Sequence, residues 1–526
     1  MLPKVDGAAP FQGIWAPDLN KIKESTMNRR FSAGFILMLA LLTRALALDG
    51  EFRIHDPSTL VRCDGRFYTY GTGGTCLVSE DGWTWGRGAT PPRRGMAPDI
   101  IHVGDRYLMY VARNVGAQPR ADINLVWTRS LDTNSPDGKW EEAGVVASSD
   151  GVEDCNAIDP GLMLDPTDGK LWMVYGSYFG FIRLVELDPK SGLRKDPNAT
   201  PVDLAINCEA PILIHEGGWY YLLATHGSCC RGADSGYNIR MGRSRKVTGP
   251  YLDHEGVDMI RGGGRLFAGS RGRVIGPGHF GRIQLEDGVE KFSCHYEADL
   301  DRGGASVLDI RPLLWKDGWP VAGDNLQEGT YQIESVRTGT VLELAVEGTP
   351  VGGRRERRGG PGPGGPASPP PGGGPPPGGG GGFFAGTAGS IPDQEVAQVS
   401  TNWPNGELPL RMATYLCQAQ QKWSLTAATN AGGYLGSPHF KIAVAHTDRA
   451  LAVTPEGELT VVPAFTGAPE QLWRIDQLAD GTWRLQPKST PGRAQPVALS
   501  AIGASFATVS KFDAGSNKHR WILKAP

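Results

Sequence analysis

Apolar and polar positions from about residue 52 to about residue 319 alternate in short runs that are rich in aromatic residues. Four of these runs are 67–70, 107–111, 171–175 and 219–223. Each run follows a Gly-containing turn signal, at 64–65, 104–105, 168–169 and 217–218 respectively. This unit of turn plus aromatic strand recurs roughly every 40 to 60 residues, which is typical of β-propeller blades. Long amphipathic helical patterns are absent, so the sequence predicts an all-β fold.

The pattern changes after Asn325, where a second β-rich region begins with runs at 331–336 and 341–346. Residues 352–382 are almost all Gly and Pro around a basic cluster. Such a composition buries too little apolar surface to order itself. Because strands of the second domain already precede this block, we expect a disordered insertion within that domain. A plain interdomain linker is the alternative.

The C-terminal region carries a repeat with a spacing of about 50 residues, in which Trp closes each copy. The three copies are Gln421-Lys-Trp423, Gln471-Leu-Trp473 and His519-Arg-Trp521. This Gln-x-Trp pattern resembles the ricin-type β-trefoil, in which Trp and Gln help to form a shared core. The third copy departs from the pattern, since His519 stands where Gln is expected. The resemblance implies a β-trefoil over 326–526 that contains the insertion 352–382.

Composition and charge narrow the classes of function. The 526 residues are too many for one ordinary domain. Formal net charge is −3, and no basic stripe appears, so the sequence argues against a nucleic-acid partner. The chain has 73 Gly and 40 Pro residues. Part of this excess lies in the low-complexity block, and the rest is typical of a turn-rich β protein.

Eight cysteines lack the paired spacing of a zinc site, so we expect no structural metal centre. Cys63 and Cys76 flank an apparent hairpin and are our preferred disulfide pair. For the adjacent Cys229 and Cys230 we expect two thiols, with a vicinal disulfide as the alternative.

The N-terminal region has the order of a secretory signal peptide over 27–47. Asn28-Arg29-Arg30 precedes an apolar run from Phe31 to Leu42, and Ala45-Leu46-Ala47 follows. The run is too short to span a bilayer comfortably, although a short membrane anchor is the alternative. Residues 1–26 then form an upstream extension, and the mature protein is expected to be secreted or periplasmic, with no other membrane segment.

Three acidic residues lie at the margins of apolar, β-rich runs, with Pro directly after each or one residue later. They are Asp56 in His-Asp-Pro-Ser, Asp159 in Asn-Ala-Ile-Asp-Pro and Glu209 in Cys-Glu-Ala-Pro. Pro has a fixed φ and no N–H, so it tends to mark strand margins, where a carboxylate points out of the sheet. Three such carboxylates suggest one convergent site. Glycoside hydrolysis needs such a site, because one carboxyl group donates a proton and another activates water or attacks carbon.

Together these motifs resemble the family 43 glycoside hydrolases, most closely the endo-α-1,5-L-arabinanases. The resemblance runs from about Glu51 to about Val321, and it implies a five-bladed β-propeller over 48–323. It also rests on a further set of segments in the right order: Ala-Pro-Asp-Ile (97–100), 172–178, 228–251, Gly-Pro-Gly-His (276–279) and Arg-Pro-Leu-Leu-Trp (311–315).

The resemblance also implies roles for the three acids. Asp56 would be the general base that activates water, and Glu209 the general acid that protonates the leaving oxygen. Asp159 would raise the pKa of Glu209 and orient it. The family inverts anomeric configuration, so a separation of roughly 6.5–9.5 Å is expected between the carboxyl groups of Asp56 and Glu209. These three acids and Asp99 would begin the innermost strands of successive blades.

Four further residues are candidates for substrate contact: Asn156, Asp99, Tyr178 and Phe179. Asp99 could instead be structural, and the two aromatic residues could pack in the core. His279 resembles the family's channel histidine, which implies a hydrated calcium ion or a similar ion near the acids. Calcium prefers oxygen ligands, so a single His would make a loose site. His55 and His226 are expected to be structural, although either could face the pocket.

Carbohydrate binding by the trefoil would need an Asp and an aromatic residue in each unit, as the ricin-type resemblance implies. Glu343 lies near the expected Asp position, whereas 450–454 and 497–501 offer no carboxylate. At least two of the three sugar pockets therefore look degenerate, and a structural appendage is the alternative to a second sugar contact.

The sequence thus predicts a secreted, two-domain glycosidase that acts on α-1,5-linked arabinan, a side chain of plant pectin. One alternative is another family 43 specificity, such as an exo-acting arabinofuranosidase or a β-xylosidase. Two others are a non-catalytic carbohydrate-binding protein and a protein-interaction propeller, which would not need three carboxylates at strand starts.

Overall fold

The structure is a computed structural model that describes residues 48–117, 119–150, 155–285, 288–346, 400, 402–490 and 495–526. The predicted upstream extension 1–26, the signal peptide 27–47 and the insertion 352–382 lie outside the described residues. The described residues belong to one compact unit. No helix in the described part of the chain is long and apolar enough to cross a membrane.

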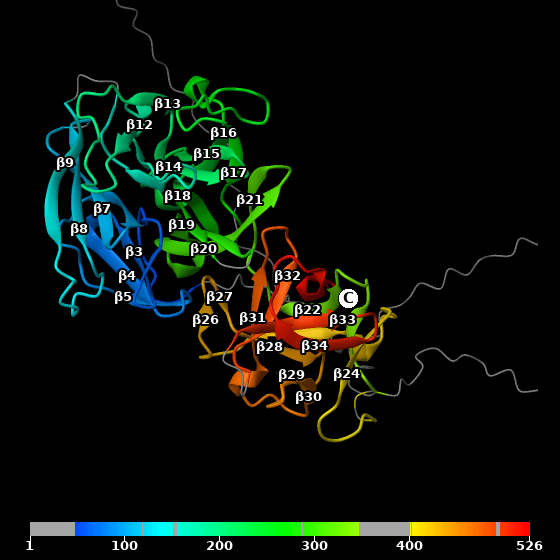
Figure 1. Ribbon diagram of the computed structural model, residues 1–526. Coiled ribbons are helices and arrows are strands. Elements are labelled where there is room, and N and C mark those ends of the chain that lie inside the picture. The colour runs from blue at the N-terminus through cyan, green and yellow to red at the C-terminus, as the bar shows by residue number, and fades with distance from the viewer. Residues whose placement is uncertain are drawn as a thin grey trace, which may run out of the picture. The chain divides into compact units, whose positions relative to one another are not determined.

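The N-terminal half forms the predicted five-bladed β-propeller, and the predicted all-β fold is confirmed (Figure 1). In each blade four strands follow one another in chain order and pair antiparallel. The innermost strands are β2 (Val61–Cys63), β6 (Met96–Val103), β10 (Gly161–Leu164), β14 (Glu209–Glu216) and β18 (Val274–Gln284). The second strands are β3 (Arg66–Gly71), β7 (Arg106–Asn114), β11 (Leu171–Tyr175), β15 (Trp219–His226) and β19 (Glu290–Asp299). The outer strands are β4 (Thr75–Ser79), β5 (Thr84–Arg87), β8 (Ala121–Thr128), β9 (Glu141–Ser149), β12 (Phe181–Leu187), β13 (Val202–Ile206), β16 (Asn238–Ser244), β17 (Arg265–Ala268), β20 (Ala305–Lys316) and β21 (Trp319–Ala322).

The four aromatic runs found in the sequence are the second strands of the first four blades. A Gly with positive φ lies in the turn before each of them, for example Gly65 at 82° and Gly169 at 73°. Gly adopts this conformation without the steric cost that a Cβ brings, so these turns can be tight. Apolar residues on facing blades then pack together, as Tyr110 of β7 does with Met173 of β11 in one buried cluster.

The segment before the first blade closes the ring against the last blade. Arg53 forms a β-bridge with Val307 of β20, and the Leu308 N–H donates to the Phe52 carbonyl at 2.9 Å. A short strand, β1 (Asp49–Gly50), pairs in parallel with β5. These pairs satisfy backbone groups that an open sheet edge would expose.

The C-terminal half is a β-trefoil whose three Trp residues are fully buried in one core cluster. The indole N–H groups of Trp423, Trp473 and Trp521 donate to the carbonyls of Leu342, Leu451 and Leu499 at 2.9, 3.0 and 3.0 Å. The same hydrogen bond from an indole N–H to a Leu carbonyl is therefore found in each of the three units.

The strands of the trefoil are β22 (Gly329–Ser335), β23 (Val341–Leu344), β24 (Leu410–Ala413), β25 (Trp423–Ala427), β26 (Gly433–Tyr434), β27 (Ser437–Pro438), β28 (Phe440–Val444), β29 (Ala450–Val453), β30 (Leu459–Val462), β31 (Leu472–Gln477), β32 (Trp483–Pro487), β33 (Val497–Ile502), β34 (Phe506–Lys511) and β35 (Trp521–Lys524). Short 3₁₀ helices connect strands in both halves: η1 (Thr72–Gly74), η2 (Gly232–Asp234), η3 (Met259–Arg261), η4 (Leu300–Arg302), η5 (Ala419–Gln421), η6 (Pro469–Gln471) and η7 (Asn517–His519).

His519, the departure from the Gln-x-Trp pattern, occupies the place of Gln in the third unit. In the first two units the side-chain oxygens of Gln421 and Gln471 accept backbone N–H groups five residues earlier, both at 2.7 Å. In the third, His519 Nδ1 accepts the N–H of Asp513 at 3.2 Å, and its Nε2 pairs with the Ser510 hydroxyl. The Nδ1 atom of His519 thus accepts a backbone N–H, as the Gln side-chain oxygen does in the first two units.

The β26–β27 hairpin joins the trefoil to the first and last blades through Leu435. This side chain is fully buried in a cluster with Trp83 and Ile310 of the propeller. Its N–H donates to the Asp81 carbonyl at 2.8 Å, and its carbonyl accepts from Lys291 Nζ at 2.6 Å. The two domains therefore share a packed apolar contact.

Candidate active site

Five residues with positive φ mark equivalent places at the innermost strands, one in each blade. They are Asp56, Ala97, Asp159, Ala210 and His279, with φ of 51°, 41°, 54°, 49° and 54°. Pro follows the first four. On β6, β14 and β18 the ladder is also interrupted by a bulge at this place. Non-Gly residues rarely adopt this conformation, and such residues concentrate at functional sites.

His55 lies between two carboxylates and links them. Its Nδ1 is 2.8 Å from Asp56 Oδ2, and its Nε2 is 2.9 Å from Glu297 Oε1. Burial of the ring opposes protonation, but hydrogen bonds to both acids outweigh it and raise the pKa of His55 to about 10. At neutral pH His55 is therefore a cation held between two anions.

Asp56 is buried and is held by several polar neighbours. The Thr72 hydroxyl donates to Asp56 Oδ2 at 2.5 Å, and the Asp56 N–H donates to His295 Nδ1 at 2.8 Å. Burial would raise its pKa, but the surrounding histidines hold the pKa of Asp56 below its usual range. His279, whose Nδ1 is 3.2 Å from Asp56 Oδ1, has a pKa lowered to about 4 by burial. His55, whose pKa is raised, contributes a positive charge that faces Asp56 at neutral pH.

Glu209 and Asp159 have the opposite tendency, because both hold their protons more tightly than usual. Burial, with the charges of Asp56 and Glu297, raises the pKa of Glu209 to about 7 even though the Tyr237 hydroxyl donates to Glu209 Oε1. Burial and the nearby Glu209 raise the pKa of Asp159 well above its usual value. The site thus contains an ionised Asp56 together with two carboxyl groups that are biased towards the protonated form.

Asp99 of the second blade forms hydrogen bonds to backbone groups of the first and third blades. Its Oδ1 accepts the Thr59 N–H at 2.9 Å, and its Oδ2 accepts the Leu162 N–H at 2.8 Å. It is the fourth residue of β6, so the expectation that it begins an innermost strand is wrong, and Ala97 has the equivalent place. With both oxygens engaged by backbone groups, the geometry gives Asp99 a structural role.

The other predicted contact residues differ in accessibility. Tyr178 and Phe179 are 39% and 54% exposed, and the Tyr178 hydroxyl donates to the Thr225 carbonyl at 3.2 Å. Asn156 is fully buried, and its Nδ2 donates to the Ser177 hydroxyl at 3.3 Å. The two aromatic side chains are therefore accessible from solvent, whereas Asn156 is not.

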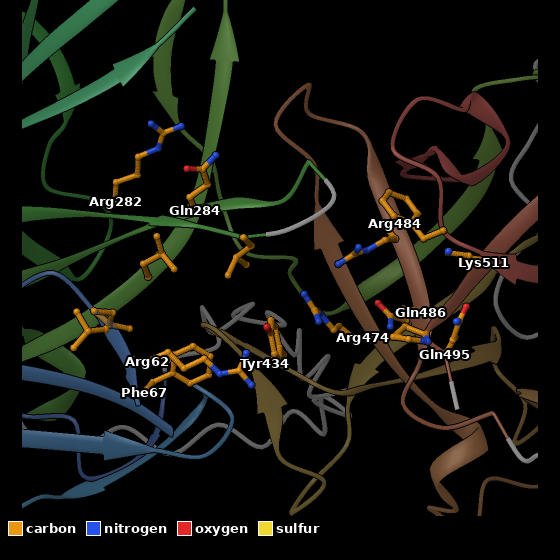
Figure 2. Close-up of a pocket in the computed structure, with 16 residues that line it drawn as sticks. Arg62, Phe67, Arg282, Gln284, Tyr434, Arg474, Arg484, Gln486, Gln495 and Lys511 are labelled. Atoms are coloured by element: carbon orange, nitrogen blue, oxygen red, sulfur yellow. The ribbon is translucent and has the colours of Figure 1, made fainter. Parts of the chain in front are cut away.

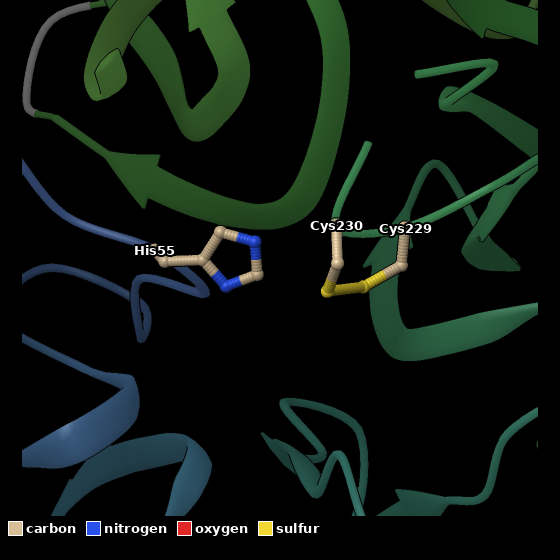
Figure 3. A group of neighbouring side chains, drawn as sticks. All are labelled: His55, Cys229 and Cys230. Carbon is tan, nitrogen blue, oxygen red and sulfur yellow. A yellow bond between two sulfur atoms is a disulfide. The ribbon is translucent and has the colours of Figure 1, made fainter. Parts of the chain in front are cut away.

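A disulfide joins Cys229 to Cys230 beside His55, so the expectation of two thiols is wrong (Figure 3). The sulfur atoms and a His55 ring nitrogen lie within 4.8 Å of one another. The Cys230 N–H donates to Glu297 Oε2 at 3.0 Å. Sulfurs bonded to each other are not thiolates, so this group does not offer the ligands of a metal site.

The predicted pairing of Cys63 with Cys76 is also wrong, since both are free and buried. Strand register gives the reason. Cys63 pairs with Arg66, whereas Cys76 pairs with Tyr70, so the two cysteines meet β3 at points four residues apart and on opposite sides. That separation is roughly 13 Å along the strand, beyond the reach of a disulfide.

The sequence reasoning missed Glu297, His295 and Tyr237. His295 and Glu297 alternate with apolar residues on β19, so they share one face of that strand. Two buried polar residues with this spacing in an apolar strand were the available signal. Tyr237 follows a Gly-rich loop and left no comparable signal.

The surroundings of His279 fit the expected hydrated cation. Among the described residues neither of its ring nitrogens has a hydrogen-bond partner, although both are buried. A cavity of about 20 Å³ next to His279, Asp99 and Asp159 has room for about one water. One available imidazole nitrogen beside the Asp56 carboxylate fits a cation that keeps most of its water ligands.

Comparisons with known proteins agree with this geometry. Residues 67–320 match the family model for glycosyl hydrolases family 43, and residues 419–504 match the ricin-type beta-trefoil lectin domain-like model. An extracellular exo-α-(1→5)-L-arabinofuranosidase of Cellvibrio japonicus is 34% identical over 54% of this chain and 90% of its own length. An extracellular endo-α-(1→5)-L-arabinanase of Bacillus subtilis is 30% identical over 57% of this chain and 99% of its own.

Among solved structures, an exo-1,5-α-L-arabinanase from a bovine ruminal metagenomic library is 34% identical, with a TM-score of 0.48. It covers 53% of this chain and 99% of its own. The two curated relatives, matched over nearly their whole length, show the family. The chain is therefore a glycoside hydrolase that belongs to glycosyl hydrolases family 43 and carries a ricin-type β-trefoil domain at its C-terminus.

Proposed function

We propose that this chain cleaves α-1,5-linked L-arabinan internally and with inversion. The observation that carries the proposal is the pairing of two carboxyl groups in opposite states near neutral pH. Asp56 has a lowered pKa, whereas the pKa of Glu209 is about 7. A glycosidase needs one ionised and one protonated carboxyl group at the same time.

In the proposed mechanism Asp56 and Glu209 act on opposite sides of the glycosidic carbon. The Asp56 carboxylate takes a proton from water as the water oxygen bonds to that carbon. Glu209 gives its proton to the departing oxygen as the carbon–oxygen bond breaks. Attack from the face opposite the leaving group inverts the configuration, which requires roughly 6.5–9.5 Å between the two carboxyl groups.

Asp159 is proposed to position Glu209 through the backbone. Its Oδ2 accepts the N–H of Ala210, the residue after Glu209, at 3.1 Å. Burial and the charge of Glu209 raise the pKa of Asp159, and the negative charges that raise the pKa of Glu209 are those of Asp56 and Glu297. Tyr178 and Phe179 are proposed to contact the sugar chain from the exposed side.

The first test is release of reducing sugar from debranched arabinan by the wild type and by Glu209→Gln. Removing a general acid costs roughly 10²- to 10⁴-fold in rate, so the variant should release almost nothing. Glu186→Gln is the matched control, because Glu186 lies on β12 and pairs with Lys195 at the surface. Equal rates for Glu209→Gln and Glu186→Gln would refute the assigned acid.

An exo-acting arabinofuranosidase is the second candidate, because the relative named as such is 34% identical. Sizing the products separates the two functions. Internal cleavage yields a ladder of short oligomers early in the reaction, whereas exo cleavage yields one product size throughout. Binding of arabinan without any product would support a non-catalytic carbohydrate-binding protein.

A hydrated calcium ion held by His279 is a separate proposal. Such an ion would add positive charge next to Asp56 and help to keep that carboxylate ionised. Treatment with EDTA should then lower the thermal midpoint, and calcium should restore it in the wild type. His279→Ala should have a lower midpoint that neither EDTA nor calcium changes. A wild type that is indifferent to EDTA would contradict the proposal.

Export is proposed because both curated relatives are named extracellular and residues 27–47 read as a signal peptide. Sequencing the N-terminus of protein recovered from the medium of an expressing bacterium tests it, with a start at Leu48 expected. A start at Met1 or Met27 would contradict it.

A second sugar contact through the trefoil is also proposed. Glu343 is the nearest candidate, but its carboxylate accepts bonds from Gln421 and Arg411 and is buried. Retention of the wild-type protein on lactose-agarose or arabinan-agarose would support this contact, and no retention on either matrix would contradict it.

A further inference from the structure

A second cleft, separate from the acids, lies between the ends of the propeller strands β2 and β18 and the trefoil (Figure 2). Its volume is about 610 Å³, within the range of small-molecule sites. Five of the sixteen residues lining it are basic, and none is acidic. The basic residues are Arg62, Arg282, Arg474, Arg484 and Lys511.

The position of the cleft on β18 separates it from the candidate active site. His279 of this strand lies beside Asp56, whereas Arg282 and Gln284, further along, line the cleft. Five residues of extended strand from His279 to Gln284 cover roughly 15 Å. A ligand in the cleft would therefore leave the acids accessible.

The basic residues outnumber the carboxylates that face them. Arg282 is neutralised, since its Nη2 lies 2.7 Å from Glu216 and 2.8 Å from Glu290. Arg474 and Arg484 share the single carboxylate of Asp476.

The two remaining cations are at the surface of the cleft. Arg62 and Lys511 are exposed, and neither has a carboxylate partner among the described residues. The described lining thus has an excess of positive charge that the carboxylates of the described residues do not balance.

Arg484 is fixed in the wall rather than lying loosely on a surface. Its side chain is 5% exposed, its Nη2 donates to Asp476 Oδ2 at 2.7 Å, and its guanidinium lies over the Phe512 ring. Within the described part of the chain its buried Nε has no hydrogen-bond partner. A buried donor without an acceptor is unfavourable, so an acceptor from a ligand would stabilise this arrangement.

The guanidinium of Arg474 is held in a similar way, 3.4 Å from the centre of the Tyr434 ring. Guanidinium groups fixed on aromatic faces present a planar set of N–H donors, which matches carboxylates. Three amide side chains, Gln284, Gln486 and Gln495, also line the cleft (Figure 2). Each amide can both donate to and accept from a hydroxyl group.

We propose that this cleft binds an acidic oligosaccharide, whose uronate carboxylates pair with Arg62, Arg484 and Lys511 and whose hydroxyl groups bond to the glutamines. The preference for an anion rests on the cleft alone. The choice of a saccharide rests also on the proposed function. Bound there, a uronate-bearing polysaccharide would hold the enzyme on its substrate while the acids at the other end of β18 stay free to act.

The test is isothermal titration of the full chain at low salt with tetragalacturonate, with cellotetraose as the neutral tetrasaccharide and with inorganic phosphate. Tetragalacturonate should bind, cellotetraose should not, and phosphate should bind at least tenfold more weakly than tetragalacturonate. Because these probes are not arabinan, binding and hydrolysis are measured independently. Tetragalacturonate binding without arabinan hydrolysis would remove the proposed function and leave this site standing.

The test variant is the double substitution Arg62→Gln and Lys511→Gln, which changes exposed side chains and is checked for folding by its thermal midpoint. Loss of two ion pairs should weaken tetragalacturonate binding by about tenfold. The matched control is Arg113→Gln with Lys139→Gln, two exposed cations of the second blade.

The proposal is overturned by equal affinity in the two double variants, by equal binding of cellotetraose, or by no binding of tetragalacturonate. Phosphate binding as tight as tetragalacturonate binding would replace it with a general anion site. Arg484→Lys keeps the charge but loses the planar fork of donors, so it should also weaken tetragalacturonate binding, and unchanged affinity would contradict pairing with Arg484.

Discussion

The protonation of Glu209 depends on burial and on four neighbouring groups, of which His55 and Tyr237 lower its pKa. Burial and the negative charges of Asp56 and Glu297 favour its protonated form, and the Tyr237 hydroxyl favours its ionised form. His55 lies between the two anions and, with its pKa raised to about 10, stays positively charged. The site therefore favours a protonated Glu209 together with an ionised Asp56.

The pH profile should report this balance. A general acid works only when protonated, so kcat/KM should fall about tenfold per pH unit above a pH of about 7, the pKa of Glu209. Tyr237→Phe removes a hydrogen bond to the ionised form, which raises the pKa of Glu209 and shifts this basic limb to higher pH.

Tyr221→Phe is the control for that shift, because the Tyr221 hydroxyl donates to the Gly318 carbonyl away from the site. Both profiles are measured as initial rates on debranched arabinan from pH 4 to pH 10. A basic limb that is identical in the two variants would exclude Tyr237 as a partner of the acid.

The strands position these groups through a feature repeated in every blade. A positive φ, followed by Pro in four of five cases, turns the chain at the mouth of the channel. At this place two blades carry Asp56 and Asp159, a third carries His279 and two carry Ala. The repeat shows why Pro beside an acid was informative in the sequence.

In the trefoil the repeated element is the bond between the motif residue and a backbone N–H. His519→Ala would remove the part-buried hydrogen bond from the Asp513 N–H, which should lower the free energy of unfolding by about 0.5–1.5 kcal/mol. His519→Gln restores the residue of the first two units and should lose less. Urea denaturation of both variants checks this, and equal losses would show that the acceptor does not matter.

The propeller and trefoil of the whole molecule are coupled by Leu435. Leu435→Ala removes a buried side chain from a cluster formed by both domains, which should cost about 2–5 kcal/mol. Calorimetry should show the two domains unfolding at better separated temperatures in this variant than in the wild type. Leu416→Ala, where the side chain is 65% exposed, is the control and should leave the profile unchanged.

The sequence by itself determined the fold class, the family and the most informative acids. Alternating aromatic strands, Gly turns and the Gln-x-Trp repeat are local patterns. Each depends only on residues that are close in the sequence, so it can be recognised without the tertiary structure. The three acids were found because Pro follows each of them directly or one residue later, and Pro restricts its own backbone wherever it occurs.

Tertiary structure alone decided which distant residues meet. Glu297 reaches His55 across 242 positions of the chain, and no spacing rule could have joined them. The preferred disulfide was wrong because strand register, set by the whole sheet, separates Cys63 from Cys76. The pKa of Glu209 likewise depends on burial and on the charges around it, which exist only once the blades close into a ring.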